Sequence, residues 1–312
     1  MTTNKILAGN ASGEYEVNYD APMPTIRPHQ MLCKTDAVAL NPMKAIMREQ
    51  SPNPGVGGYE FSGTVMQVGT SVTRFKPGDR VFGLVPGLNP DDRDSGAFTD
   101  HVIATADLCC EIPGSTTAPQ ASIMPLALGA VGYAASKLLG PTAPGREKKV
   151  GDKPEYVLVA GADSLPGRLA TQLFTLSGIK PVVTCSSSAK TTMKDLGAVE
   201  VFDHRSKMCG REIKNFTRNT LACVLDCASS ENTMAICFEA LGSRGGKYVG
   251  LDAPSTRIKY TRRDVSVDWV QAADFQLRGC LELGLGLERI QHGTDLVRQG
   301  HTQGQKLVNS IA

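Results

Sequence analysis

Residues 155–178 read EYVLVAGADSLPGRLATQLFTLSG, and this stretch decides the fold class. The run YVLVA is short and apolar, as in a buried strand, and the apolar positions of RLATQLFTL recur at the spacing of an amphipathic helix. A glycine-rich turn from Gly161 to Gly167 joins the two, and Pro166 suits the first turn of a helix. This order predicts the first unit of a Rossmann fold, in which a pyrophosphate lies at the positive end of the helix.

The turn is an imperfect phosphate-binding motif. The G-x-G-x-x-G spacing is absent, and the carboxylate of Asp163 would repel phosphates. An ordinary strand-to-helix turn without a ligand fits the same residues. We prefer nucleotide binding because of the place of the turn between a buried strand and a helix.

The alternation of strand and helix continues after this unit. Strand-like runs at 180–185, 199–203, 221–229 and 245–252 alternate with helix-like runs at 192–198, 211–217 and 231–241. This pattern is typical of a parallel, doubly wound α/β sheet.

The N-terminal third has a different sequence pattern. Extended runs at 31–40, 61–69, 79–85 and 98–113 are separated by glycine- and proline-containing turns, which predicts a compact β-rich domain. The apolar stretch at 121–139 then predicts a long helix. We therefore expect a β-rich domain at 1–124, a nucleotide-binding domain at 125–270, and a C-terminal return to the first domain at 271–312, with a helix at 286–300 and a strand at 305–311.

Composition excludes several classes of protein. The net charge of +2 comes from 33 basic and 31 acidic residues without a basic stripe, so a nucleic-acid-binding face is not expected. The N-terminus lacks an apolar signal region and no run approaches transmembrane length, so we expect a cytoplasmic protein without a membrane segment. The nine cysteines are odd in number and mostly lie in apolar runs, which favours reduced, buried thiols.

The end of the second strand indicates which nucleotide binds. An NAD site usually has an acidic residue there, whereas this chain has Ser186, Ser187, Ser188 and Lys190. Hydroxyl groups and a lysine suit a 2′-phosphate, and Arg205 after the next strand would reinforce them. NADP(H) is therefore the expected cofactor, although the serines also fit a helix N-cap.

At this point a resemblance is clear. The runs NPMKAIM (41–47), GYEFSGTVMQVG (58–69), FKPGDRVFG (75–83), GAFTDHV (96–102), FDHRS (202–206) and GGKYVGLD (245–252) resemble, in this order, the medium-chain dehydrogenase/reductase superfamily. The chain is most similar to the fungal trans-acting enoyl reductases, which serve polyketide synthases that lack a working enoyl reductase domain. The most specific parts are residues 184–206 and the closing runs at 286–300 and 304–308.

The resemblance implies a fold and an activity. The fold would combine a GroES-like β-rich catalytic domain with a Rossmann domain. The activity would be NADPH-dependent reduction of an α,β-unsaturated polyketide acyl thioester in secondary metabolism. The partners would be a polyketide synthase or a hybrid with a nonribosomal peptide synthetase (PKS-NRPS), and its acyl carrier protein, with the chain itself a monomer or weak dimer. Two alternatives stay open: a non-redox or degenerate member that binds or cyclises a polyketide intermediate, and a reductase of small enones or quinones.

The resemblance also implies site residues. Those that would line the cofactor are Pro42, Met43, Lys44, Ala45, Ser164, Leu165, Pro166, Gly167, Ser186, Ser187, Ser188, Ala189, Lys190, His204, Arg205, Gly250, Leu251, Leu307 and Val308. Those that would line the acyl chain, in a cleft between the domains, are Val131, Gly132, Tyr133, Ala134, Ala135, Ser136, Lys137, Asp274, Phe275, Gln276, Leu277 and Arg278. No residue is an obvious proton donor, and His204 and Lys44 also fit surface positions.

Zinc is not expected. Asn41 and Tyr59 stand where zinc-dependent relatives have a cysteine and a histidine, and residues 85–96 lack the four cysteines of a structural zinc loop.

The chain also departs from the enoyl reductases that it resembles. Ala130 and His204 replace a threonine and a tyrosine of these enzymes, and the aspartate and lysine of their N-P-x-D-x-K run are lost or displaced. A segment is missing between Gly279 and Gly286. We therefore expect NADPH binding to survive and enoyl reduction to be weak unless a partner closes the cleft.

Overall fold

The computed structural model describes residues 3–10, 14–40, 55–89, 92–140 and 155–270, and the backbone of two strands at 280–285 and 306–310. The chain divides into two compact units. The first comprises Met1–Leu126 and Arg278–Ala312, and the second Ala127–Leu277. The sequence-based boundaries at 1–124, 125–270 and 271–312 stay a prediction.

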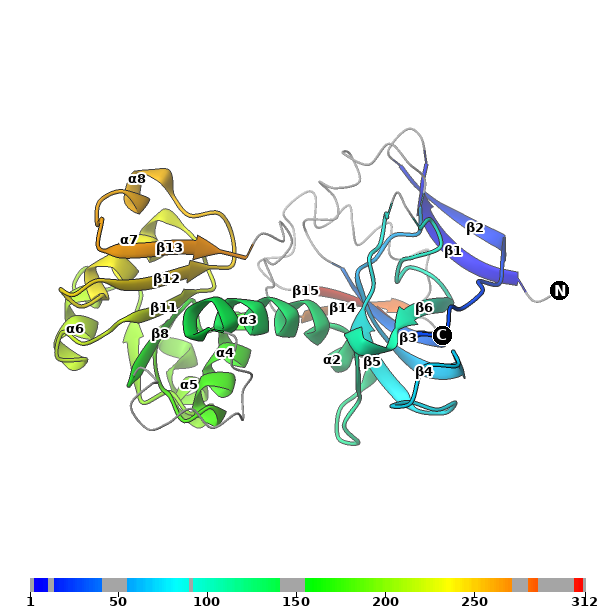
Figure 1. The fold of residues 1–312 in the computed structure, drawn as a ribbon, viewed down its shortest axis with the longest axis horizontal. Helices are drawn as coiled ribbons and strands as arrows, with labels where there is room; N and C mark the ends of the chain where they lie inside the picture. Colours follow the sequence, from blue (N-terminus) through cyan, green and yellow to red (C-terminus); the bar gives the residue numbers. More distant parts are fainter. Residues whose placement is uncertain are drawn as a thin grey trace. The chain divides into compact units, whose positions relative to one another are not determined.

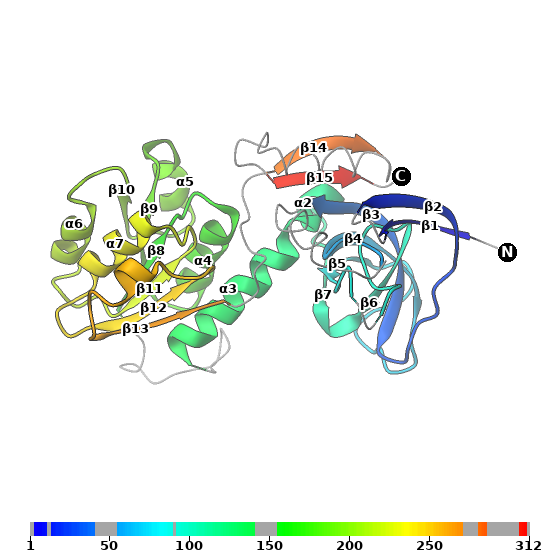
Figure 2. The same ribbon diagram turned by 90° about the horizontal axis from the view of Figure 1, so that it is seen from above.

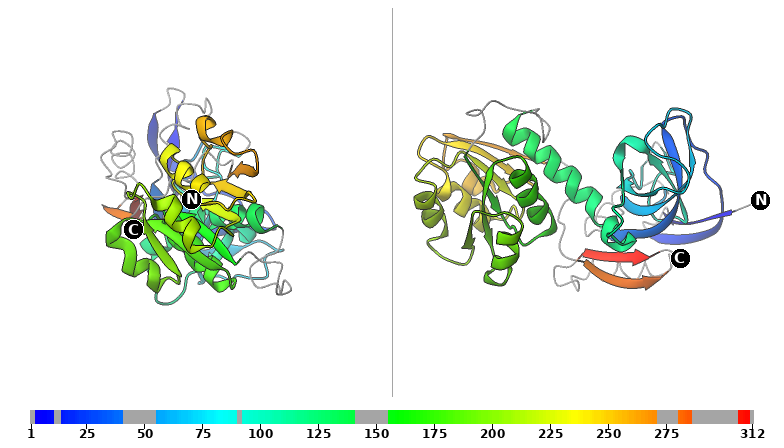
Figure 3. Two further views of the ribbon diagram at one scale, coloured as in Figure 1. Left: turned by 90° about the vertical axis from the view of Figure 1, so that its left-hand side faces the viewer. Right: turned by 90° about the horizontal axis from the view of Figure 1, so that it is seen from below.

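The first unit is built mainly from antiparallel strands (Figures 1 and 2). Strands β1 and β2 form a hairpin, and a larger sheet runs in the order β14-β15-β3-β4-β5-β7, with β6 also paired to β3. The parallel pair β14 and β15 lies side by side in Figure 3. The strands of this unit are β1 (Thr3–Gly9), β2 (Tyr15–Pro22), β3 (Gln30–Leu40), β4 (Glu60–Val68), β5 (Arg80–Leu84), β6 (His101–Thr105), β7 (Cys109–Glu111), β14 (Cys280–Leu285) and β15 (Lys306–Ser310), with the 3-10 turn η1 (Ala106–Leu108) before β7.

Alternating side chains of these strands make the core of the first unit. Cys33 on β3, Phe61 and Val65 on β4, and Val102 on β6 are buried in one apolar cluster. Their period of two is the reason why the sequence predicted strands here. The hairpin of β1 and β2 was not predicted, although Tyr15, Val17, Tyr19 and Ala21 alternate with more polar residues along β2.

The apolar stretch predicted as one helix is two helices. Helix α2 (Ala118–Ser122) begins at a capping box in which Thr117 and Gln120 exchange hydrogen bonds, and α3 (Met124–Leu139) follows after Ile123. Within the described residues, the span Ala118–Leu139 is long and apolar enough, by length and composition alone, to cross a membrane, and half of its apolar window is buried inside the protein. The expectation that no run approaches this length was therefore wrong, because alanines and leucines raise its mean hydropathy. Burial of this kind is equally typical of a core helix.

The second unit contains a six-stranded parallel sheet in the order β10-β9-β8-β11-β12-β13. This order confirms the predicted doubly wound Rossmann sheet, whose halves meet between β8 and β11. Its strands are β8 (Tyr156–Ala160), β9 (Lys180–Cys185), β10 (Glu200–Asp203), β11 (Cys223–Asp226), β12 (Gly246–Gly250) and β13 (Val265–Trp269). Its helices, besides α3, are α4 (Leu165–Leu176), α5 (Lys190–Asp195), α6 (Cys209–Phe216), α7 (Glu231–Ala240) and α8 (Thr256–Lys259), with a 3-10 turn η2 (Ser187–Ala189).

Helices cover both faces of this sheet (Figure 1). Val157 and Val159 of β8 pack with α3, α4 and α5, while Leu158 of the same strand packs with α6 and α7. A strand buried on both faces reads as a continuous apolar run, as YVLVA does. The edge strand β13 was missed, because its exposed serine and its aspartate interrupt the apolar pattern.

The C-terminal return is described only in its two strands. Strand β15 falls within the strand predicted at 305–311, and β14 occupies the stretch at which the sequence indicated a missing segment. The helix predicted at 286–300 lies outside the described residues.

Candidate functional site

The glycine-rich turn after β8 is closely packed. Gly161 has a φ of +70°, which favours glycine, and its N–H donates to Thr184 Oγ1 at 3.3 Å. Ser164 caps α4: its Oγ accepts the Gly167 N–H at 3.2 Å and donates to the Gly161 carbonyl at 2.7 Å. A Cβ at Gly167 would lie 2.5 Å from both Ala162 Cα and the Gly161 carbonyl oxygen. The first turn of α4 therefore lies against the glycine turn without an intervening side chain at this position.

The serines after β9 form the second part of the site. Ser186 Oγ and Ser188 Oγ lie 3.1 Å apart, and Ser187 Oγ donates to Asp203 Oδ2 at 2.6 Å. Ser187, Ser188 and Lys190 are exposed, whereas the side chain of Ala189 is buried in the core. Hydroxyl and ammonium groups therefore face solvent at the carboxyl end of β9.

The carboxylate of Asp163 has a structural partner that the sequence did not reveal. Its Oδ2 accepts the backbone N–H of Ser186 at 3.2 Å, so it links the glycine turn to the serine loop. Beside it, burial raises the pKa of the Cys185 thiol to about 11, with Asp163 and Asp203 adding to the rise. Cys185 is therefore a neutral, buried thiol at neutral pH.

Strand β10 ends beside the serine loop. Asp203 lies opposite Cys185 in the parallel register, and the His204 N–H donates to the Cys185 carbonyl at 3.4 Å. The hydroxyl of Ser187 and then the N–H of Arg205 hold the pKa of Asp203 below its usual range. Arg205 is exposed and His204 is half-buried. Because Asp203 accepts both the Ser187 hydroxyl and the Arg205 N–H, the backbone of Arg205 lies near the predicted serines.

The carboxylate of Asp226 is buried at the carboxyl end of the other half of the sheet and accepts several hydrogen bonds there. Asp226, at the end of β11, accepts hydrogen bonds from Tyr248 Oη at 2.9 Å, Thr233 Oγ1 at 2.8 Å, and the N–H groups of Ala228 and Ser229. Burial is the main reason why its pKa is raised. A Cβ at Gly161 would lie 3.0 Å from Ala228 Cβ, so the loop that Asp226 holds packs against the glycine turn. The sequence signal was a carboxylate at the end of an apolar strand, and it was missed.

The remaining predicted cofactor residues are spread more widely. Gly250 and Leu251 end β12, where the Leu251 N–H donates to the Asp226 carbonyl at 3.0 Å. Leu307 and Val308 belong to β15 of the first unit, where they pair with Leu40 and Ala39. Residues 42–45 lie outside the described residues.

The predicted acyl-binding residues on α3 fall into two groups. Val131, Ala134 and Ala135 are buried in the core of the second unit, whereas Gly132, Tyr133 and Ser136 are exposed. Their helical spacing puts the two groups on opposite faces. Residues 274–278 lie outside the described residues.

Lys137, also on α3, is committed to an ion pair. Its Nζ lies 2.7 Å from Asp268 Oδ2 and 4.9 Å from the centre of the Tyr133 ring. The hydrogen bond that Lys137 donates to the Asp268 carboxylate is the main cause that raises the Lys137 pKa, so the ammonium stays protonated at neutral pH.

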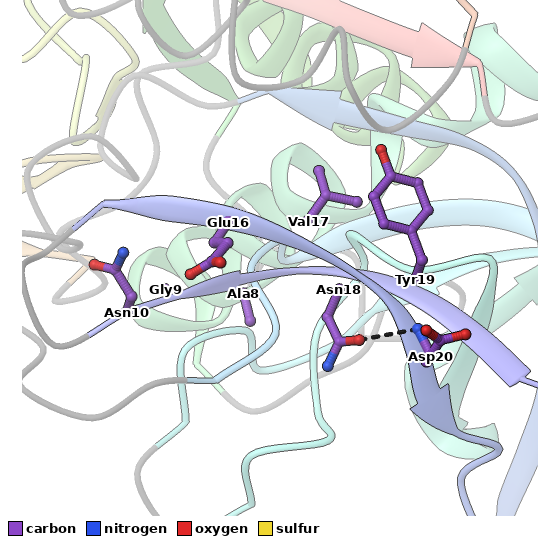
Figure 4. A pocket seen from close by; sticks show the side chains of 8 residues that line it. All are labelled: Ala8, Gly9, Asn10, Glu16, Val17, Asn18, Tyr19 and Asp20. Atoms are coloured by element: carbon purple, nitrogen blue, oxygen red, sulfur yellow. Dashed lines mark hydrogen bonds between the residues drawn. The ribbon is translucent and has the colours of Figure 1, made fainter.

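A concave surface of about 500 Å³ lies elsewhere, on the β1–β2 hairpin (Figure 4). Glu16 and Asp20 supply acidic groups and Tyr19 an exposed ring, and the Asp20 N–H donates to Asn18 Oδ1 at 2.9 Å. It contains none of the predicted site residues.

The described residues contain no cluster of three or more histidine, cysteine, aspartate or glutamate side chains that would hold a metal ion. Glu60, in the Gly58-Tyr59-Glu60 run, is fully buried, and its Oε2 accepts the Leu126 N–H at 3.1 Å in the first turn of α3. A carboxylate at this end of a helix complements its dipole. Asn41 lies outside the described residues, and the absence of zinc stays a prediction.

A nicotinamide dinucleotide fits the edge of the Rossmann sheet. The positive end of α4 begins in the glycine turn, where a phosphate would find backbone N–H groups, and hydroxyl groups line the next loop. These features lie at the carboxyl ends of the strands, on the β9 side of the point where the strand order reverses, which is where such folds bind nucleotides.

Comparisons with known proteins agree with this geometry. Residues 27–114 match the alcohol dehydrogenase GroES-like domain family, as predicted for the β-rich part. The trans-enoyl reductase grgB of a Penicillium species is 40% identical over 273 residues, which cover 87% of this chain and 76% of that protein. The trans-enoyl reductase caaB of Aspergillus niger is 32% identical over 352 residues, with coverage of 98% and 96%.

A solved structure matches the fold over its whole length. The crystal structure of the CurK enoyl reductase aligns with a TM-score of 0.66 at 18% identity, covering 100% of both chains. At this identity the likeness concerns the fold alone. This fold joins a GroES-like unit to a Rossmann unit, and an oxidoreductase with this fold takes a nicotinamide cofactor.

Proposed function

This chain belongs to the fungal trans-enoyl reductases of the medium-chain dehydrogenase/reductase superfamily, and from this membership we propose that it reduces an α,β-unsaturated polyketide acyl thioester with NADPH. When bound, the reduced nicotinamide supplies a hydride to the β-carbon of the enoyl group. The protein must then stabilise the enolate oxygen and allow a proton to reach the α-carbon. The single observation that carries this function is the family relationship, at 40% identity over 87% of the chain.

The nucleotide half of the proposal rests on the turn between β8 and α4. The N-terminal amides of α4, capped by Ser164 and placed against Gly161 by Gly167, would bind the pyrophosphate. The Asp226 network would hold the β11–α7 loop on the other side of the same turn. Gly250 and Leu251 at the end of β12 and Leu307 and Val308 on β15 are proposed, with residues 42–45, to complete the cofactor site.

The choice of NADPH rests on charge. No carboxylate ends β9, and Ser186, Ser188, Lys190 and Arg205 offer donors to a 2′-phosphate. The nearest carboxylates are already hydrogen-bonded to protein groups, Asp163 to the Ser186 N–H and Asp203 to Ser187 and the Arg205 N–H. Part of their capacity to accept hydrogen bonds is therefore used within the protein, and neither carboxylate belongs to the end of β9, where an NAD-binding acid would lie.

The acyl chain is proposed to contact the exposed members of the α3 set, Gly132, Tyr133 and Ser136, with Lys137 held nearby by Asp268. The acyl group would arrive on the carrier protein of a polyketide synthase or PKS-NRPS. We propose that the chain acts in the cytoplasm as a monomer or weak dimer.

A second candidate is a family member that binds a polyketide intermediate without reducing it alone. One observation favours it. The caaB alignment spans 352 positions but contains only 98% of this 312-residue chain, so caaB has residues with no counterpart here. If those residues wall the acyl site in caaB, water would enter the site here and weaken stabilisation of the enolate.

The test compares substrates at equal concentration. NADPH oxidation should accompany reduction of a crotonyl thioester of pantetheine or of the partner's carrier protein, and should be slower with a free enone or a quinone. NADPH binding without oxidation, in the presence of carrier-bound substrate, would favour the second candidate. Faster turnover of a quinone than of any thioester would contradict both.

A further inference from the structure

Two carboxylates hold the serine loop at the end of β9. Asp163 Oδ2 accepts the Ser186 N–H at 3.2 Å, and Asp203 Oδ2 accepts the Ser187 hydroxyl proton at 2.6 Å. Asp203 Oδ1 accepts the Arg205 N–H at 2.9 Å. Asp203 therefore contacts both polar segments at this edge of the sheet, the serine loop and the start of the β10–α6 loop.

The contact at 2.6 Å decides which serines are available to a ligand. Because the Ser187 proton is directed at Asp203, this hydroxyl does not donate it to a phosphate. Ser186 Oγ and Ser188 Oγ share one hydrogen bond at 3.1 Å, which uses only one of their two protons. One hydroxyl proton of this pair remains for a ligand.

The same carboxylate fixes the backbone from which Arg205 extends. Besides the Arg205 N–H on its side chain, Asp203 accepts the Ser206 N–H on its carbonyl at 3.0 Å, which closes a turn. Asp203 is also paired with Cys185 in the β9–β10 register, so both loops leave the sheet side by side. The Asp203 side chain thus links the two backbone segments that carry the serine hydroxyls and the Arg205 guanidinium.

We propose that Asp203 is a positioning residue that establishes the preference for a 2′-phosphorylated nucleotide, although its own charge opposes a phosphate. The inference rests on the proposed choice of NADPH. The two effects of Asp203 have opposite signs. Its charge lies at a half-exposed position, where water and salt screen repulsion, whereas its hydrogen bonds order both loops.

Substitution of Asp203 separates the two effects, because positioning and charge predict opposite changes in the preference for a 2′-phosphate. Asp203→Ala removes the charge and both hydrogen bonds. If positioning dominates, the preference for a 2′-phosphate falls, and if charge dominates, it rises. Asp203→Asn removes the charge but keeps one carbonyl oxygen as an acceptor for Ser187 or Arg205. It should therefore retain more of the preference than Asp203→Ala.

The probes are adenosine 2′,5′-bisphosphate and AMP, with each dissociation constant measured by calorimetry on the full chain. We expect Asp203→Ala to lower the ratio of the two affinities about fivefold to tenfold, as expected for losing one or two hydrogen bonds. Asp195→Ala removes an exposed carboxylate from the last residue of α5. Among the hydrogen bonds of the described residues this side chain makes none with the serine loop, so the ratio should stay unchanged. Circular dichroism and the melting temperature confirm that each variant is folded.

Each outcome decides the inference. A lower ratio for Asp203→Ala with partial retention in Asp203→Asn supports it. An unchanged or higher ratio in Asp203→Ala, with a clear preference in the parent, overturns it and leaves the choice of NADPH intact. A parent protein that binds both probes equally overturns the choice of NADPH and the inference with it.

Discussion

Two helical glycines of the second unit should respond to alanine with opposite signs. Gly167 lies in the first turn of α4, where a Cβ would be 2.5 Å from Ala162 Cα and from the Gly161 carbonyl oxygen. Gly132 lies on α3, where a Cβ would meet no atom within 4 Å. The chemical change is identical, so only the surroundings differ.

The structure gives the magnitudes. Ordinary carbon contacts are about 3.5 Å or longer, so Gly167→Ala must move the start of α4 away from the turn by about 1 Å. Overpacking against backbone costs about 1–3 kcal/mol, of which better helix propensity recovers up to about 1 kcal/mol. We expect a net loss of about 1–2 kcal/mol for Gly167→Ala and a gain of about 0.5–1 kcal/mol for Gly132→Ala.

The single tryptophan makes the assay specific. Trp269 lies on β13 of the second unit, so its fluorescence during urea unfolding reports on the unit that contains both glycines. Gly167→Ala should lower the urea midpoint and weaken NADPH binding, because the amides that would bind the pyrophosphate move. Gly132→Ala should raise the midpoint. Equal shifts of the same sign would refute the claim that close packing at Gly167 places the helix.

Three further results are expected. Arg262 donates to the carbonyls of Phe238, Leu241 and Gly242 at the end of α7. Arg262→Ala should therefore lower the free energy of unfolding in urea by about 2–4 kcal/mol, and Arg262→Lys should lower it less. An alanine variant with unchanged stability would disprove this capping role. Because burial raises the folded-state pKa of Asp226, its contribution to stability should decline as pH rises from about 4 through that pKa. Asp226→Asn should flatten this part of the curve of unfolding free energy against pH. Identical curves for the parent and the variant would contradict this prediction. Elemental analysis of the purified chain should find no stoichiometric zinc, and a chelator should leave the melting temperature unchanged; one zinc per chain would overturn the zinc-independent assignment.

The Rossmann sheet could be predicted because its signals are local. Val157, Leu158 and Val159 form an uninterrupted apolar run, and Gly161 follows within two residues of its end. Burial on both faces demands such a run, so the pattern and the fold have the same cause. The start of α2 at Ala118 was missed, although Thr117 and Gln120 form a capping-box pattern in the sequence, and the break at Ile123 was missed as well.

The polar contacts of the site could not be predicted, because they join residues far apart in sequence. Asp163 reaches Ser186 across 23 positions, and Asp203 reaches Ser187 across 16. Sequence alone gave Asp163 only its charge and therefore an unfavourable role. Its partner becomes visible once β8 and β9 lie side by side. The acyl-binding residues predicted on α3 show the same limit of sequence-based prediction. The resemblance assigns a run of consecutive residues, whereas the helix places Ala134 in the core and Tyr133 on the surface.

Isotope transfer tests the central claim most directly. The protein is incubated with NADPH that carries deuterium at the transferable position of the nicotinamide and with a crotonyl thioester, alone and on the carrier protein of the partner synthase, and the acyl product is analysed by mass spectrometry. We predict a saturated thioester with a single deuterium at the β-carbon, formed faster on the carrier protein. An acyl chain that stays unsaturated under both conditions, or a saturated product without deuterium at the β-carbon, would contradict the assignment as an NADPH-dependent enoyl reductase.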